Sequence, residues 1–365
     1  MMRILFVSFS DFRGGAAIAA SSLFKLVNVS KKFLTAEKKK KFSHKIFNIF
    51  EFYLISFLRI FEKILIFFFL KKKFHQSLNI FNTKIYKKIN LFNYNIINLH
   101  WINRSMISLS DILKLKGKIL ISMHDMWFLN STEHYSTKFK IGDDFISKYC
   151  WIKKKKIFKN EKFFFLAHNK WMYDNLKNTF PKYKKRFFLC EYYPINTKLF
   201  KPRNKNTLRK KYKLPLNKKI ILFSSQDNSD YRKGYFYFQK IMNNFKNNNE
   251  FYFLSVGKKN EEELNCKNHK HIEFLPFNKI PEVYSLSDIF LCTSIIDNLP
   301  LTILEAISSG NLVISFNNGG ATELVKKVGF VYEFNQIDKL INQTKKINSD
   351  LIRKKSKLAR NFALK

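Results

Sequence analysis

Cysteine is scarce in this chain of 365 residues, and its four cysteines lie far apart. None of them forms a C-x2-C pair or has a pair of histidines nearby, so neither a zinc site nor a disulfide framework is indicated. We therefore expect reduced thiols in a cytoplasmic protein. A signal peptide is not expected either, because an apolar run of strand length, residues 4–9, begins almost at once.

Acidic residues are also few. Only 27 Asp and Glu stand against 67 Lys and Arg, which gives a formal net charge of +40. Three explanations are open: binding to nucleic acid, binding to an anionic membrane at roughly 1 kcal/mol per basic residue, and compositional drift from AT-rich coding. We favour a membrane surface together with drift, and we expect no specific nucleic-acid partner.

Length and composition favour two globular domains. The chain is long enough for two cores, and 46% of its residues are hydrophobic, so it is not a disordered polyelectrolyte. Strand-length apolar runs alternate with helical stretches on both sides of a basic, proline-punctuated connector at residues 191–216. We therefore predict an α/β fold with two doubly wound parallel sheets.

Polar or small residues directly follow several predicted strands in the first half. Gly14 and Gly15 follow the first strand at a turn into a helix, where backbone without a side chain can approach a ligand closely. They do not form a G-x-G-x-x-G fingerprint. Three later runs end in histidine: His100, His124 and His168. A histidine at a strand end can be a ligand contact or a core residue bonded to backbone.

In the second half, Asp297 and Glu305 form a D-x7-E pair, in a polar loop after a predicted strand and in the helix that follows. Both acids can reach one sugar nucleotide, and the helix N-terminus offers N–H groups to a phosphate. An isolated pair of this kind is more often part of an ordinary capped helix. The flanking strand, D-N-L-P and G-G-A-T-E, all in order, favour the functional interpretation here.

The dipeptide Arg232–Lys233 precedes Gly234 after another predicted strand. Arginine offers a planar fork to two oxygens and lysine a point charge, so the pair can stabilise a diphosphate leaving group. No D-x-D motif or acid cluster suited to Mg²⁺ stands out, and we expect no essential metal and no cofactor beyond a nucleotide-sugar co-substrate.

These motifs resemble those of the retaining GT-B glycosyltransferases of family 4, which have two Rossmann-like domains facing a central cleft. The D-x7-E pair resembles their E-x7-E signature, with aspartate in place of the first glutamate. H-D-M-W-F-L-N-S-T-E-H-Y, from His124, resembles a loop of one branch found in exopolysaccharide and O-antigen clusters. The resemblance covers most of the chain and fails in residues 31–92 and at the extreme C-terminus.

The resemblance implies roles for single residues. His124 and Asp297 would be catalytic, with Asp297 at the donor sugar and His124 orienting that sugar rather than acting as a base. The donor nucleotide would be bound by Gly14, Gly15, Arg232, Lys233, Asn298, Leu299, Thr302 and Glu305. The acceptor side would comprise His100, Asp125 and Trp127. Asp125 would hold His124 or touch the acceptor.

The resemblance also implies an organisation and an activity. An N-terminal acceptor domain would span residues 1–195 and a donor domain residues 196–349, with residues 350–365 forming a helix that returns to the first domain. The activity would be retaining transfer of a hexose from a UDP- or GDP-sugar to a lipid-linked or polysaccharide acceptor. Two alternatives stay open: a nucleotide-sugar 2-epimerase of the same architecture, and a basic nucleic-acid-binding protein with an inactive cleft.

Residues 31–92 depart from the family pattern. The apolar stretch at 46–70 is long enough to cross a bilayer, but charges within it make a true span costly: Glu51, Arg59, Glu62 and Lys63. Lysines at 38–41 and 71–73 flank it. We expect either a helix lying in the membrane interface or a buried helical pair of the first domain. In the first case the protein would associate peripherally with the inner face of the plasma membrane.

Overall fold

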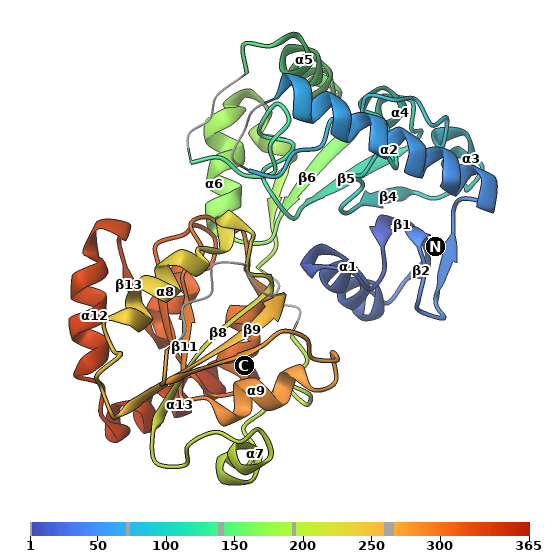
Figure 1. The fold of residues 1–365 in the computed structure, drawn as a ribbon. Helices are drawn as coiled ribbons and strands as arrows, with labels where there is room; N and C mark the ends of the chain where they lie inside the picture. Colours follow the sequence, from blue (N-terminus) through green and yellow to red (C-terminus); the bar gives the residue numbers. More distant parts are fainter. Residues whose placement is uncertain (1, 71–73, 138–141, 192–194, 259–265) are drawn as a thin grey trace. The chain divides into compact units, whose positions relative to one another are not determined.

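The computed structural model describes residues 2–70, 74–137, 142–191, 195–258 and 266–365 (Figure 1). The lysine run at 71–73 and residues 192–194 of the predicted connector therefore lie outside the described residues. The chain divides into two compact units, Met1–Pro194 and Ile195–Lys365. Each unit contains its own parallel sheet and its own cluster of buried apolar side chains.

The first unit is built on a seven-stranded sheet with the order β3-β2-β1-β4-β5-β6-β7, and its strand pairings are parallel. The order reverses between β1 and β4, whose carboxyl ends therefore form the switch point at which such sheets bind ligands. The strands are β1 (Arg3–Ser10), β2 (Ser30–Glu37), β3 (Ser43–Lys45), β4 (Ile96–Leu99), β5 (Lys118–Met123), β6 (Phe163–Ala167) and β7 (Phe187–Leu189).

Side-chain caps start four helices of the first unit. Asn48, Ser108, Asp144 and Asn169 each accept a hydrogen bond from the backbone N–H three residues later, which satisfies a donor that the helix leaves unpaired. The helical segments are α1 (Gly15–Leu26), α2 (Ile49–Phe69), α3 (Tyr86–Asn90), α4 (Leu109–Leu113), α5 (Phe145–Lys159), α6 (Lys170–Thr179) and the 3-10 turn η1 (Pro181–Arg186).

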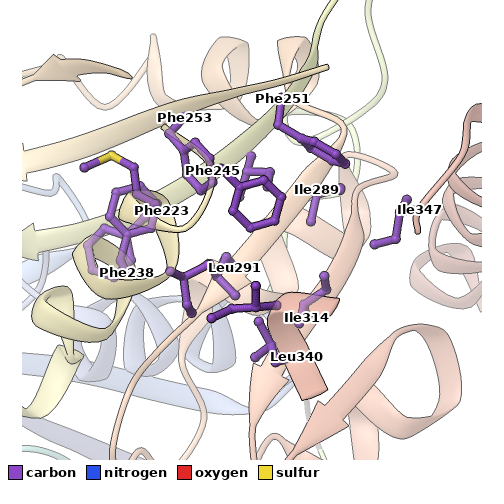
Figure 2. Packing of buried hydrophobic residues seen from close by; sticks show 14 of the residues in the cluster. Phe223, Phe238, Phe245, Phe251, Phe253, Ile289, Leu291, Ile314, Leu340 and Ile347 are labelled. Atoms are coloured by element: carbon purple, nitrogen blue, oxygen red, sulfur yellow. The ribbon is translucent and has the colours of Figure 1, made fainter. Parts of the chain in front are cut away.

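The second unit has a six-stranded parallel sheet with the order β10-β9-β8-β11-β12-β13. Its order reverses between β8 and β11. Phe245 packs edge-on against Phe251 and Phe253 in the core under this sheet, with ring centroids 5.2 and 5.4 Å away (Figure 2). The strands are β8 (Lys219–Asp227), β9 (Phe251–Lys258), β10 (His269–Ile272), β11 (Ile289–Cys292), β12 (Leu312–Phe316) and β13 (Phe330–Tyr332).

The last helix packs within the second unit. It begins at Ser349 and contacts α10 (Leu301–Ser308) and α11 (Thr322–Val328). Its Arg360 guanidinium donates to the carbonyl oxygens of Thr197, Phe200 and Ser308. The helical segments of this unit are α7 (Lys205–Lys211), η2 (Tyr231–Lys233), α8 (Tyr235–Asn243), α9 (Ile280–Leu286), α10 (Leu301–Ser308), α11 (Thr322–Val328), η3 (Phe334–Gln336), α12 (Ile337–Lys345) and α13 (Ser349–Leu364).

The predicted α/β class with two doubly wound parallel sheets is confirmed. The expectation of a buried helical pair at residues 46–70 is wrong. This stretch forms a single helix, α2, whose buried side chains are those of Ile55 and Glu62. Among the described residues, no helix combines the length and the apolar character that crossing a bilayer requires.

Candidate active site

In the second unit, the candidate residues gather at the carboxyl ends of β8 and β11, the two strands between which the sheet order reverses. Arg232 and Lys233 lie in η2, which follows β8. Asp297 lies in the loop after β11, and Glu305 lies on α10 after that loop. Open α/β sheets bind their ligands at this position, because the loops from the two central strands diverge there.

The carboxylate of Asp297 pairs with both neighbouring cations. Its Oδ2 lies 2.7 Å from Nη1 of Arg232 and 2.7 Å from Nζ of Lys233. Burial by itself would raise the pKa of Asp297, but Lys233 and Arg232 together lower it to about 2. Asp230 holds the other branch of Arg232, with 3.2 Å between Oδ2 and Nη2. The two cations are therefore held side by side in a defined geometry.

Gly234 allows these two loops to meet. It has φ +66°, and a Cβ at this position would lie 2.0 Å from the carbonyl oxygen of Thr293, directly after β11. The Ile295 N–H also donates to the carbonyl oxygen of Arg232 at 2.8 Å. Because glycine has no side chain, the turn after β8 can approach the loop after β11 closely enough for both cations to reach Asp297.

Glu305 is the second acid of the D-x7-E pair. Burial raises the pKa of Glu305 to about 7, and the nearby hydroxyl of Tyr284 counteracts this only in part. Its ionisation is therefore balanced near neutral pH. Leu299 and Thr302 are partly exposed near the start of α10, whereas Asn298 is buried beside Asp297. The helix begins after Pro300 without a side-chain cap.

The G-G-A-T-E segment supports Asp297 through its backbone. The Asp297 N–H donates to the carbonyl oxygen of Asn318 at 2.8 Å, and the Gly320 N–H donates to that of Asp297 at 3.0 Å. This support, like the roles of Gly234 and Tyr284, was missed in the sequence. The R-K-G motif drew attention to Gly234 in the sequence. Only the fold shows that the absence of a side chain there lets the turn after β8 approach the loop after β11.

In the first unit, the three strand-end histidines lie in a row, because β4, β5 and β6 are neighbours in the sheet. The ring centroids of His100 and His124 are 5.1 Å apart, and those of His124 and His168 are 5.2 Å apart. Nδ1 of His100 lies 2.8 Å from Nε2 of His124. Gly14 directly precedes α1 and Gly15 begins it, after the turn that follows β1, and β1 is next to β4 in the sheet. Gly14 has φ +85°.

All three histidines are held neutral. Burial lowers the pKa of His100 to about 3, with a further contribution from His168, and lowers that of His168 to about 4. Burial, His100 and His168 lower the pKa of His124 well below its ordinary value. A group with such a low pKa is a weak base, so the geometry favours hydrogen bonding over proton abstraction at His124.

Asp125 does not bond to His124, as had been one expectation. Its Oδ2 lies 2.6 Å from Nδ1 of His134 and accepts from the indole N–H of Trp101 at 3.0 Å. Nε2 of His134 lies 2.9 Å from Oγ of Ser77, which completes a Ser–His–Asp row. Ser77 is only 2% exposed. The row has the order of groups found in a hydrolytic triad, but its serine is buried. The hydrogen bonds of the row instead join the 124–136 loop to residues 75–78.

Trp127, which we expected on the acceptor side, is buried in the first unit. Trp127 is 1% exposed, and its indole N–H donates to the carbonyl oxygen of Ser77 at 2.7 Å. The Nζ of buried Lys154 lies 3.7 Å from the centre of the indole ring and donates to the carbonyl oxygens of Trp127, Asn130 and Ser131. Trp127 therefore anchors the loop. His100 is buried as well.

No group of three or more His, Cys, Asp or Glu within the described ranges is arranged to hold a metal ion.

Comparison with known proteins bears on the fold and on the second unit. Residues 204–363, most of the second unit, match the family described as glycosyl transferases group 1. The chain is similar over its full length to a glycosyltransferase from Rickettsia africae ESF-5, with 18% identity, 93% of that chain covered and a TM-score of 0.66. It is also similar to Anabaena Alr3699/HepE in complex with UDP-glucose, with 16% identity, 100% of this chain and 94% of that chain covered, and a TM-score of 0.64.

The chain has the GT-B fold. A stretch of 77 residues is 39% identical to the UDP-Gal:alpha-D-GlcNAc-diphosphoundecaprenol alpha-1,3-galactosyltransferase of Escherichia coli. That match covers 20% of this chain and 20% of the relative, so the chain matches only about a fifth of that relative's length. Arg232, Lys233, Asp297 and Glu305 all lie within residues 204–363, the part of the second unit that matches the group 1 glycosyl transferases.

Proposed function

We propose that this GT-B protein is a retaining glycosyltransferase of family 4, transferring a hexose from a UDP- or GDP-sugar to a lipid-linked or polysaccharide acceptor in cell-surface glycan synthesis. The observation that carries this proposal is the cluster of Arg232, Lys233 and Asp297, with Glu305 beside it, at the switch point of the second sheet. The match of this unit to group 1 glycosyl transferases supports it.

The cation pair accounts for donor activation. Cleavage of the bond between the sugar and the diphosphate builds negative charge on the leaving phosphate. Arg232 and Lys233 stabilise that charge by pairing with phosphate oxygens, and no metal is needed for this. Both cations are pre-positioned by Asp297, which then accepts a hydrogen bond from the donor sugar. Glu305 accepts hydrogen bonds from the ribose hydroxyls.

Transfer with retention then balances without a protein base. The acceptor oxygen forms its bond to the anomeric carbon on the face from which the diphosphate departs, and the acceptor proton passes to a leaving phosphate oxygen. His124, neutral at physiological pH because of its low pKa, hydrogen-bonds to the sugar and orients it. The weak basicity of this histidine supports such a role over proton abstraction.

The nature of the substrates is supported by the relatives. The E. coli relative is named as a galactosyltransferase that acts on a diphosphoundecaprenol-linked sugar, and the Anabaena protein was solved with UDP-glucose. A lipid-linked acceptor would place the protein at the inner face of the plasma membrane, as a peripheral protein. The strongly basic composition, with a net charge of +40, supports an anionic surface as a partner.

The test is a thermal-shift panel of UDP, GDP, ADP and their hexose conjugates, with and without Mg²⁺, followed by transfer assays with radiolabelled donor. We expect one nucleotide series to raise the melting temperature without metal. Asp297→Asn should lower the transfer rate by about 100-fold or more, because the donor site loses its central carboxylate. The matched control is Asp350→Asn, which changes an exposed aspartate of the same unit outside the candidate site.

Three outcomes would contradict the proposal. A shift with oligonucleotide and none with any nucleotide sugar would indicate the nucleic-acid-binding alternative. Interconversion of the nucleotide sugar without an acceptor would indicate the epimerase. An inverted anomeric configuration in the product, read by NMR, would exclude a retaining mechanism.

A further inference from the structure

The surface of α2 that faces away from the first unit is entirely apolar. Its residues recur at intervals of three and four, as one face of a helix requires, and each is between 43% and 77% exposed. We call this the outer face of α2: Phe50, Tyr53, Phe57, Ile60, Phe61, Ile64, Phe67 and Phe68. Figure 1 shows α2 as one uninterrupted helix.

The polarity of α2 is the reverse of that of an ordinary surface helix, which turns its charges to water. Glu62 is 3% exposed and points into the unit, where it accepts hydrogen bonds from the Ser105 hydroxyl and the Asn79 N–H. Glu51 accepts from the Asn48 N–H and pairs with Lys88 of α3. Because both acids are bound to neighbouring groups, the rotation of the helix about its axis is defined and the outer face carries no negative charge.

The exposed charges on and near α2 are positive. Residues 31–92 contain fifteen Lys and Arg against three Glu. Lys63, on the flank of α2, is exposed. Lys84, just before α3, and Lys87, within α3, are exposed as well. The ion pair between Lys88 and Glu51 joins α3 to the start of α2. An apolar face bordered by cations matches the chemistry of an anionic bilayer, whose acyl chains lie below a layer of phosphates.

We propose that α2 lies in the plane of an anionic lipid bilayer, with its outer face among the acyl chains and the neighbouring lysines at the phosphates. A second copy of this chain is disfavoured as the occupant, because each copy carries a net charge of +40 and two such faces would bring like charges together. The helix lies flat rather than across the membrane, in line with the absence of a spanning helix among the described residues.

This inference deepens the proposed function, since it names the surface that would bring the protein to a lipid-linked acceptor. It does not depend on transfer, because bilayer binding is measured without a donor or an acceptor. If transfer is absent and bilayer binding is retained, the proposed function fails and this inference stands.

The test is flotation of the full-length protein with vesicles of phosphatidylcholine, with and without about one third phosphatidylglycerol, at about 0.15 M salt. We expect flotation with the anionic vesicles. The double substitution Phe57→Ser, Ile64→Ser should lower the partition coefficient at least about tenfold, because two large apolar side chains leave the bilayer. The matched control is Phe145→Ser, which removes an 82% exposed phenylalanine of the same unit outside α2 and should change nothing.

A second arm tests the charges. Lys63→Gln with Lys87→Gln should weaken binding to anionic vesicles several-fold and leave binding to pure phosphatidylcholine unchanged. Equal flotation of the wild type and the Phe57, Ile64 variant would overturn the inference. So would a lipid-free dimer in sedimentation velocity that the same variant dissociates, since a second copy would then cover the outer face. All the variants change exposed side chains, and equal melting temperatures would confirm that they fold.

Discussion

Two acids in the candidate donor site have pKa values that move in opposite directions. Lys233 and Arg232 outweigh burial at Asp297 and lower its pKa to about 2, whereas burial raises the pKa of Glu305 to about 7. Asp297 therefore contributes stability above the ordinary range of aspartate, and this is lost only as the pH falls toward 2. Protonated Glu305 contributes stability at low pH. This contribution is lost as the pH rises through about 7, because burial disfavours the ionised form.

Glu305 leads to a prediction about pH. If its carboxylate accepts hydrogen bonds from the ribose, binding requires the ionised form, so nucleotide affinity should rise with pH. For a pKa of about 7 the ionised fraction grows about tenfold between pH 6 and pH 8, and the dissociation constant measured by calorimetry should fall by about that factor. Glu305→Gln should bind weakly and equally at both values. A wild-type affinity that is the same at pH 6 and pH 8 would contradict the assignment.

At the scale of elements, the site depends on how closely two loops approach each other. Gly234 has a positive φ, and a Cβ on it would lie 2.0 Å from the backbone carbonyl oxygen of Thr293. Gly14 also has a positive φ, but a Cβ on it would have no atom within 4 Å. The two glycines therefore separate two effects of substitution. One is the cost of the backbone conformation, and the other is the displacement of a neighbouring loop.

We predict that Gly234→Ala is the more damaging change. Gly14→Ala should cost about 1–3 kcal/mol of stability without any clash, because φ 85° with ψ 164° is a backbone region that essentially only glycine adopts. Gly234→Ala should cost about 2–4 kcal/mol, because the clash with Thr293 adds backbone strain. It should also weaken nucleotide binding, because Arg232 and Lys233 move away from Asp297. Urea unfolding measures the stability and calorimetry measures the nucleotide affinity. An unchanged affinity in Gly234→Ala would contradict the displacement of Arg232 and Lys233.

At the scale of the whole molecule, the net charge is +40. It predicts nonspecific binding to oligonucleotides, which differs from nucleotide binding at the candidate site in how strongly the affinity depends on salt. Oligonucleotides of any sequence should bind at low salt and lose affinity by about 10³-fold or more between 50 and 200 mM salt, as binding driven by counterion release does. Nucleotide binding at the Arg232–Lys233 site should change far less, since buried pairs are weakly screened. Fluorescence anisotropy with two unrelated oligonucleotides measures the oligonucleotide affinity. A preference for one of them at high salt would support a nucleic-acid-binding function.

The sequence by itself determined the fold class and where to look for a site. Buried parallel strands are continuous apolar runs, and the residues that follow them must lie at one edge of the sheet, so the histidines, the R-K-G turn and the D-x7-E pair were identifiable from local pattern. The GT-B resemblance rested on the same residues, and the fold is confirmed. Their catalytic and binding roles stay predictions.

Only the tertiary structure decided how side chains are shared and which way they point. Local pattern did not reveal that Asp125 bonds to His134, that Lys154 packs on the indole of Trp127, or that Asp297 holds both cations, because each pairing depends on how the chain folds in space and not on a periodic pattern. The charges in 46–70 looked like interruptions of an apolar helix. Hydrogen bonds from Ser105 and Asn79, distant in sequence, turn Glu62 inward and leave the aromatic face of α2 outside.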